Sequence, residues 1–175
     1  MNSDALVWKK FAQIGLIGVA PLIILFTFFK LSPDNSIFIY FSDLTKDFSA
    51  NISTTNLALT KPLAFYCKVA PFFSLYFAAK HINQVKSKPN IKNMASMVFY
   101  SIGFVAVYLI MFYIFVVGQF DMNNGNRLLK ATASNDYTII LYYIIVFAGM
   151  YTLTFILLML VRLLYSEFRK SIIYK

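Results

Sequence analysis

A lysine and a proline, Lys68 and Pro71, interrupt an apolar stretch that is otherwise suited to cross a lipid bilayer. A charge at the centre of a bilayer is penalised by about 2.5–3.5 kcal/mol or more, so it is found where it has a partner or where it reaches the interface. Pro71 has no N–H and crowds the carbonyl of Cys67, so the helix is expected to bend there. The two residues therefore mark a place where the chain can bind another polar group within a membrane.

Two interpretations of Lys68 follow. At about 1.5 Å per residue, the lysine lies on the order of 10 Å below Lys61 and the outer end of its helix, so its side chain can snorkel to the interface. Alternatively, the ammonium is held inside the bundle by a carboxylate or a carbonyl, and Asp121 and Asp136 are the nearest candidate carboxylates. Our hypothesis is a Lys68–Asp136 pair. The competing role of Asn135 and Asp136 is an N-cap for the helix that follows them.

The rest of the sequence lacks the patterns of catalysis. No acidic residue or histidine lies inside an apolar stretch, so an intramembrane proton relay or metal site has no ligands. His81 stands alone in a polar connection, and there is no HExxH, no GxSxG, no phosphate-binding glycine loop and no pair of carboxylates. We therefore expect no enzyme, no cofactor and no metal, but a protein that acts by binding a partner.

The elements that carry these residues are four apolar stretches separated by polar connections. Each stretch has the roughly 17–25 residues that a helix needs to cross about 30 Å of hydrocarbon. The composition, 59% hydrophobic and 13% charged, is far from that of a soluble domain. The sequence thus predicts an all-α membrane protein, a single polytopic domain over residues 1–175. Its four transmembrane helices form an antiparallel bundle and cover about 11–29, 62–79, 97–117 and 138–165.

The distribution of charge, more than the net charge of +9, predicts how this bundle is oriented. Ten basic residues flank the termini or fill the second connection, whereas the first and third connections hold five, together with five of the seven acids. By the positive-inside rule, both termini are expected in the cytoplasm. The expected surface partner is the bilayer rather than nucleic acid. The ten residues are Lys9, Lys10, Lys80, Lys86, Lys88, Lys92, Arg162, Arg169, Lys170 and Lys175.

Three local features bear on packing. Gly15 and Gly18 are small residues three apart in the first stretch, a spacing that lets another helix approach closely. The segment Ser36–Phe48 mixes large apolar residues with a few charges, so it either lies along the outer interface or folds back onto the bundle. Cys67 is the only cysteine, which excludes an intrachain disulfide, and we expect it to be a small buried side chain.

Several short runs together resemble a known family. Ile52-Ser53-Thr54-Thr55 leading to Thr60-Lys61, then Tyr66-Cys67-Lys68 with Ala70-Pro71-Phe72, is similar to the immunity proteins that protect bacteria against pore-forming colicins of the colicin A and colicin B type. The resemblance covers nearly the whole chain. The chain departs from it at Asn56-Leu57-Ala58, which stands in place of an Asn-Pro pair, and in the cytoplasmic loop. Further matches are Ile17-Gly18, Pro21-Leu22, Arg127-Leu128, Ala133 and Asn135-Asp136.

The resemblance implies a bacterial inner-membrane protein that binds the inserted pore-forming domain of its cognate colicin and prevents the channel from opening. Small-residue and kinked helix faces would pack against the toxin, and a few polar anchors would choose it, because hydrophobicity alone cannot select a partner in lipid. The candidate partner-binding residues are Tyr66, Lys68, Pro71, Asp121, Arg127 and Asp136.

Two other classes share the predicted topology. A plasmid entry-exclusion protein, or a similar inner-membrane protein that binds a partner, would also have four helices and no catalytic groups. A small transporter or channel subunit is disfavoured, because the four stretches show no internal repeat and few polar residues that would line a path.

Overall fold

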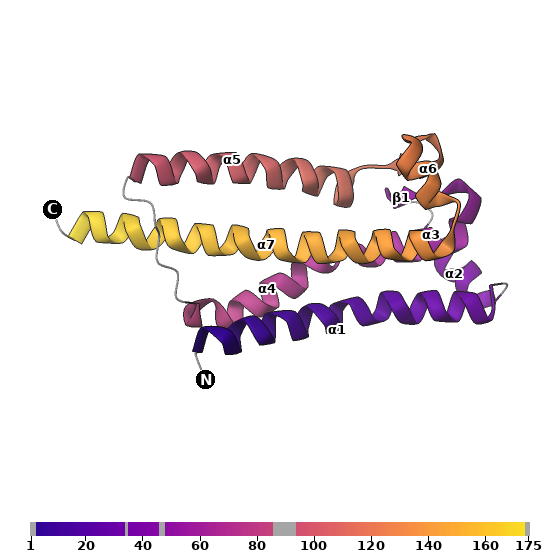
Figure 1. The fold of residues 1–175 in the computed structure, drawn as a ribbon, viewed down its shortest axis with the longest axis horizontal. Helices are drawn as coiled ribbons and strands as arrows, with labels where there is room; N and C mark the ends of the chain where they lie inside the picture. Colours follow the sequence, from indigo (N-terminus) through magenta and orange to yellow (C-terminus); the bar gives the residue numbers. More distant parts are fainter. Residues whose placement is uncertain (1–2, 34, 46–47, 86–93, 174–175) are drawn as a thin grey trace.

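The computed structural model describes residues 3–33, 35–45, 48–85 and 94–173. In these ranges four long helical stretches run in alternating directions, so that α1 begins and α7 ends at the same end of the bundle (Figure 1). Each stretch is long and apolar enough to cross a membrane. This confirms the all-α class and the four helices of membrane-spanning length. The helices are α1 (Ser3–Leu31), α3 (Leu57–Cys67) with α4 (Ala70–His81), α5 (Met94–Phe112) and α7 (Asp136–Ile173).

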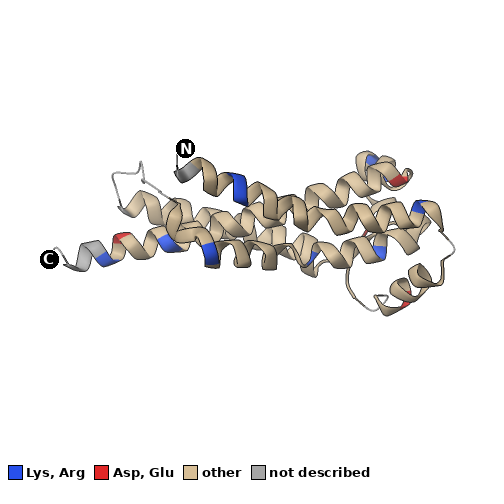
Figure 2. Cartoon of the chain, turned by 90° about the horizontal axis from the view of Figure 1, so that it is seen from below, with Lys and Arg blue, Asp and Glu red and all other residues tan. Residues whose placement is uncertain are grey.

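The helices extend beyond the predicted apolar stretches because charged residues continue the same helical turns. α1 includes Lys9 and Lys10, and α7 includes Glu167 and Arg169. Figure 2 shows most charged residues toward the two ends of the bundle, as expected if the middle lies in hydrocarbon. Some of the basic residues on which the predicted orientation depends, namely Lys86, Lys88, Lys92 and Lys175, lie outside the described residues.

The second stretch is broken into two helices, as Pro71 predicts. α3 ends at Cys67 and α4 begins at Ala70, with Pro71 in its first turn. Two short-range backbone bonds close the turn between them, from Lys68 N to Phe65 O (3.2 Å) and from Val69 N to Tyr66 O (2.9 Å). The regular ladder is interrupted here because proline supplies no N–H to the carbonyl of Cys67.

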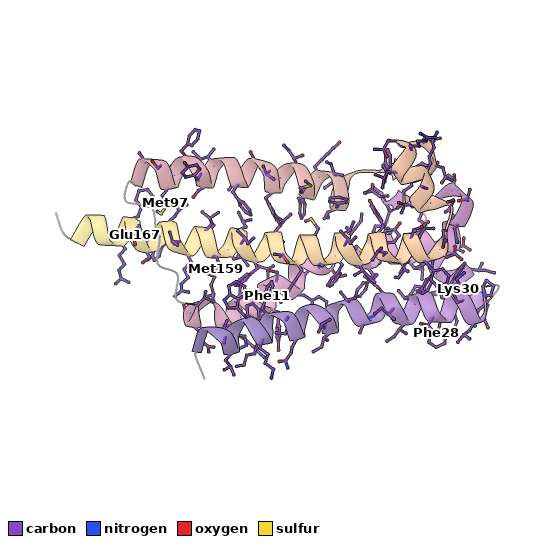
Figure 3. All side chains as sticks on the ribbon, viewed as in Figure 1. Phe11, Phe28, Lys30, Met97, Met159 and Glu167 are labelled. Atoms are coloured by element: carbon purple, nitrogen blue, oxygen red, sulfur yellow. The ribbon has the colours of Figure 1, made fainter. Side chains whose placement is uncertain are left out.

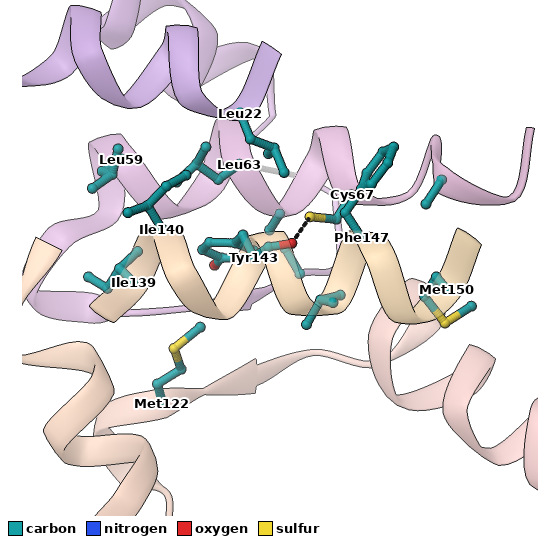
Figure 4. Close-up of a cluster of buried hydrophobic side chains, with 14 of the residues drawn as sticks. Leu22, Leu59, Leu63, Cys67, Met122, Ile139, Ile140, Tyr143, Phe147 and Met150 are labelled. Carbon is teal, nitrogen blue, oxygen red and sulfur yellow. Dashed lines mark hydrogen bonds between the residues drawn. The ribbon is translucent and has the colours of Figure 1, made fainter. Parts of the chain in front are cut away.

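The core lies where α7 packs against α1, α3 and α4 on one side and α5 on the other (Figure 1). Figure 4 shows Leu22 of α1 and Leu63 of α3 next to Tyr143 and Phe147 of α7. Cys67 is buried in this cluster, as predicted, and its thiol donates to the carbonyl of Tyr143 (3.3 Å). α7 is therefore the central helix of the bundle.

The glycines of α1 allow this packing. A Cβ atom on Gly18 would lie 2.6 Å from the ring of Phe147, and one on Gly15 would lie 3.2 Å from the ring of Tyr151. Both contacts are with α7, so the predicted close approach is confirmed. The glycine face is turned inward and is not free to receive a toxin helix.

At the end of the bundle opposite to the start of α1, the first and third connections form short ordered elements (Figure 1). Strand β1 (Asn51–Ile52) pairs in parallel with β2 (Phe120–Asp121), which joins the two connections directly. The sequence did not predict this pairing. We call this region the α6 end. It also contains α2 (Ser36–Leu44), α6 (Arg127–Ala133) and the 3₁₀ turns η1 (Thr54–Asn56) and η4 (Met122–Asn124).

The packing of Gly18 gives a stability prediction. Gly18→Ala forces a methyl group against the fully buried Phe147, and we expect a loss of about 1–3 kcal/mol in the free energy of unfolding. Gly103→Ala is the matched control, because no atom lies within 4 Å of the added Cβ and the change favours a helix by about 0.5–1 kcal/mol. SDS unfolding in mixed micelles, followed by circular dichroism, measures both. Equal stability of the two variants would contradict the packing described here.

Candidate partner-binding surface at the α6 end

The six predicted partner-binding residues fall into two groups. Three lie at the break in the second stretch, and three lie in or next to the elements of the α6 end. The structure therefore does not bring them together into one cluster. The first group is Tyr66, Lys68 and Pro71, and the second is Asp121, Arg127 and Asp136.

Lys68 reaches toward the first connection. Its Nζ donates to the carbonyl of Ser49 (2.5 Å) and lies 3.4 Å from the Ser49 hydroxyl. Lys61, about two turns earlier and 4% exposed, points the same way, with its Nζ 3.5 Å from the carbonyl of Thr45 and 3.4 Å from that of Phe48. Both ammonium groups thus contact main-chain carbonyls at or just beyond the end of α2.

The predicted Lys68–Asp136 pair is wrong, because Asp136 has other partners. Its Oδ2 lies 2.5 Å from Nζ of Lys30 in the last turn of α1, and its Oδ1 accepts from Nδ2 of Asn56 (2.5 Å). Figure 3 shows Lys30 at this end of α1. Asp136 therefore joins α1, η1 and α7. Sequence reasoning missed Lys30 as its partner, although Lys30 follows the first apolar stretch directly.

The N-cap interpretation is confirmed for Asn135. Its Oδ1 accepts from the backbone N–H of Tyr137 (2.9 Å), and its carbonyl accepts from the N–H of Ile139 (3.0 Å). Asp136 lies in the first turn of α7, where a carboxylate complements the helix dipole. Asn135 therefore caps α7, and Asp136 pairs with Lys30.

Asp121 is bound within the α6 end. Its Oδ1 accepts from the backbone N–H groups of Asn123 (3.0 Å) and Thr54 (3.4 Å), and its Oδ2 accepts from Nδ2 of Asn124 (3.3 Å). The carboxylate thus caps the start of η4 and links it to η1 by a hydrogen bond. Its hydrogen bonds are internal, so it supports the surface rather than presenting a free charge.

A network of short polar side chains continues this connection, and sequence reasoning did not find it. The hydroxyl of Ser53, which is fully buried, lies 2.7 Å from that of Thr55 and donates to Oδ1 of Asn123 (3.2 Å). Nδ2 of Asn123 donates to the hydroxyl of Thr54 (2.7 Å). The available signal was the richness of residues 49–60 in Ser, Thr and Asn, which identifies a polar segment but not its partners.

Arg127 differs from the other candidates. It lies exposed in the first turn of α6, after Asn126, whose Oδ1 caps the helix by accepting from Leu129 N (3.0 Å). Within the described residues, its guanidinium has no hydrogen bond or ion pair. Leu128 beside it is 76% exposed. Arg127 and Leu128 thus present a free cation and an apolar side chain on the surface of the α6 end.

The break in the second stretch borders an apolar groove. The groove has a volume of about 500 Å³ and lies between α1 and α4, where Ile17, Val69, Phe72 and Tyr76 are among its lining residues. Tyr66 faces inward, because its hydroxyl donates to the carbonyl of Gly18 (2.9 Å). Among the described residues, no cluster of His, Cys, Asp or Glu is arranged to hold a metal ion.

These features define a helical protein fit for a membrane, with polar side chains gathered around the ordered connections at one end of the bundle. The chain belongs to the colicin immunity protein family, whose model matches residues 34–170. It is 27% identical over 142 residues, covering 80% of this chain and 76% of the relative, to the colicin-A immunity protein of Citrobacter freundii. No solved structure matches the chain.

The matched range contains all six candidate residues. Proteins of this family confer immunity to a bacteriocin and bind a cognate colicin as inhibitors, not as enzymes. The family predicted from the sequence is thereby confirmed. Of the six candidate residues, Arg127 is the exposed charged one, and the other five mostly pack or bond within the protein.

A double-mutant cycle tests the ion pair that replaces the predicted one. Asp136→Asn and Lys30→Met should each lower the free energy of unfolding, since each removes one partner of a charge-assisted hydrogen bond. The two effects should be non-additive in the double variant. The matched cycle with Lys68→Met and Asp136→Asn should be additive within about 0.5 kcal/mol. Coupling in the second cycle and none in the first would reverse the assignment.

Proposed function

We propose that this chain is an immunity protein of the bacterial inner membrane that crosses the bilayer four times, with both termini in the cytoplasm. It binds the inserted pore-forming domain of one cognate colicin and keeps the channel closed. The observation that carries the proposal is the family match over residues 34–170, in a chain with four helices long and apolar enough to cross a membrane. The same match favours immunity over the entry-exclusion and transporter alternatives.

The proposed orientation places the α6 end in the periplasm, the side from which such a toxin enters. The exposed apolar side chains of α1 and α5 then face lipid, where toxin helices also lie. The groove between α1 and α4 is a surface for lateral packing at the break in the second stretch. Binding there favours the closed toxin if the closed form binds more tightly. A hundredfold difference, about 2.7 kcal/mol, would lower the open fraction by about the same factor.

The candidate residues take different parts in this proposal. Arg127 contacts the toxin directly, because its guanidinium is exposed beside Leu128. Asp121 and Asp136 hold the α6 end that presents it. Tyr66, Lys68 and Pro71 form the break that shapes the groove. Specificity then depends on the charge of Arg127 and on the shape of the surface, since lipid-facing apolar contacts discriminate poorly between partners.

A challenge of sensitive cells tests the function. Cells that express the chain should survive one pore-forming colicin of a panel and remain sensitive to colicins that act as nucleases. Colony counts over a dilution series of each toxin measure protection, and cells with the empty vector are the control. Survival against nuclease colicins alone would overturn the pore-directed mechanism.

The proposed contact of Arg127 has its own test. Arg127→Gln should lower the protective titre at least tenfold, which corresponds to about 1.4 kcal/mol of lost binding, at unchanged protein level in the membrane. Lys130→Gln is the matched control, because Lys130 is exposed on the same short helix. Equal protection by the two variants would remove Arg127 from the contact surface.

Lys68→Met should also weaken protection, and full protection at equal protein level would remove Lys68 from the candidates.

A further inference from the structure

α2 exposes far more apolar surface than a connecting helix in water normally would. Ile37, Tyr40, Phe41 and Leu44 follow the i, i+3, i+4, i+7 spacing of one helix face, and each is at least 45% exposed. Phe38, about 100° around the helix from Ile37, is buried, and its ring lies edge to face with that of Phe29 in α1 (centroids 5.5 Å apart). α2 thus folds onto the bundle with one face and leaves a second, apolar face without a partner among the described residues.

The contacts of the segment after α2 place it beside the second stretch rather than beyond its end. The Phe48 ring lies 5.1 Å from that of Phe65, and Ser49 is bound by Lys68. The lysines that contact this segment, Lys61 and Lys68, are about 10 Å apart along a helix at 1.5 Å per residue. A segment held along that length lies at the depth of the membrane-spanning helix.

The two lysines also donate hydrogen bonds to main-chain carbonyls at and beyond the end of α2. The last carbonyls of a helix have no partner within it, and hydrocarbon supplies no donor. Here the hydroxyl of Thr45 donates to the carbonyl of Phe41 (2.7 Å). Lys61 and Lys68 reach the carbonyls of Thr45, Phe48 and Ser49. These three carbonyls, which follow α2, are therefore bonded from inside the protein.

We propose that α2 is embedded in the leaflet at the α6 end, with its exposed face against phospholipid acyl chains and with Lys61 and Lys68 holding the segment that follows it. Lipid is the occupant because the helices that α2 packs against, α1 and α3, also expose apolar side chains, namely Phe28 and Leu31 on α1 and Phe65 on α3. The role of Lys68 is then to position this segment. The inference requires that the four helices cross a bilayer, but not that the protein binds a colicin.

Tryptophan fluorescence tests the placement. The only tryptophan, Trp8, is changed to Phe, and Tyr40→Trp is introduced into the full chain in vesicles of phosphatidylethanolamine and phosphatidylglycerol. Ile110→Trp, exposed on α5, is the reference for a lipid-facing site. With lipids brominated on their acyl chains, Tyr40→Trp should lose emission to an extent comparable with Ile110→Trp. Iodide on both sides of the membrane should not quench it.

Quenching by iodide and not by brominated lipid would show α2 in water and overturn the proposal. Quenching by neither would show the face covered by protein, which also overturns it. Lys68→Met in the Tyr40→Trp background should increase quenching by iodide, whereas Lys68→Arg, which keeps N–H donors, and Lys130→Met should not. An unchanged response to Lys68→Met would overturn the holding role. Since no colicin is used, failure here leaves the proposed function standing, and failed protection does not affect this result.

Discussion

Backbone carbonyls have no water to bond within hydrocarbon, and this constraint explains much of the arrangement. The second stretch is broken at Lys68, and side chains around the break donate to carbonyls of other segments. Tyr66 donates to Gly18, Cys67 to Tyr143 and Lys68 to Ser49. The same pattern recurs elsewhere, since the hydroxyl of Tyr143 donates to the carbonyl of Asn51 (2.5 Å). Side-chain donors to main-chain acceptors therefore fix how the helices and connections are placed.

The two ordered connections follow from the same need. β1 and β2 pair their main chains, and just beyond the two strands the hydroxyl of Ser53 donates to Oδ1 of Asn123. Nδ2 of Asn51 donates to the carbonyl of Ile114 (3.0 Å), near the end of the third stretch, where the helix widens into a π-turn over Tyr113–Val117. The α6 end is thus held together by polar bonds, while the middle of the bundle depends on the packing of α7. Buried apolar side chains that include Phe38, Met122 and Ala133 extend the core of the bundle beneath it.

The parts that the sequence predicted well are those decided locally. The length of the apolar stretches predicted the four helices, Pro71 predicted the break, and Asn135 predicted the cap of α7. Each of these features depends on residues that are close in sequence. Lys68 was assigned the wrong partner because the choice depends on where the first connection lies, and nothing near Lys68 encodes that. The close approach at Gly18 was predicted correctly, but only the structure shows that Phe147, rather than another protein, fills the space.

The single thiol of the chain has a practical consequence. Cys67 is 3% exposed, in the centre of the bundle and bonded to a carbonyl of α7. Alkylating reagents such as maleimides need an accessible thiolate, and this buried sulfur offers no access. Cys67 should therefore not react with such reagents. Cysteines introduced one at a time into the connections could then be labelled to determine on which side of the membrane each lies, with Cys67 left in place.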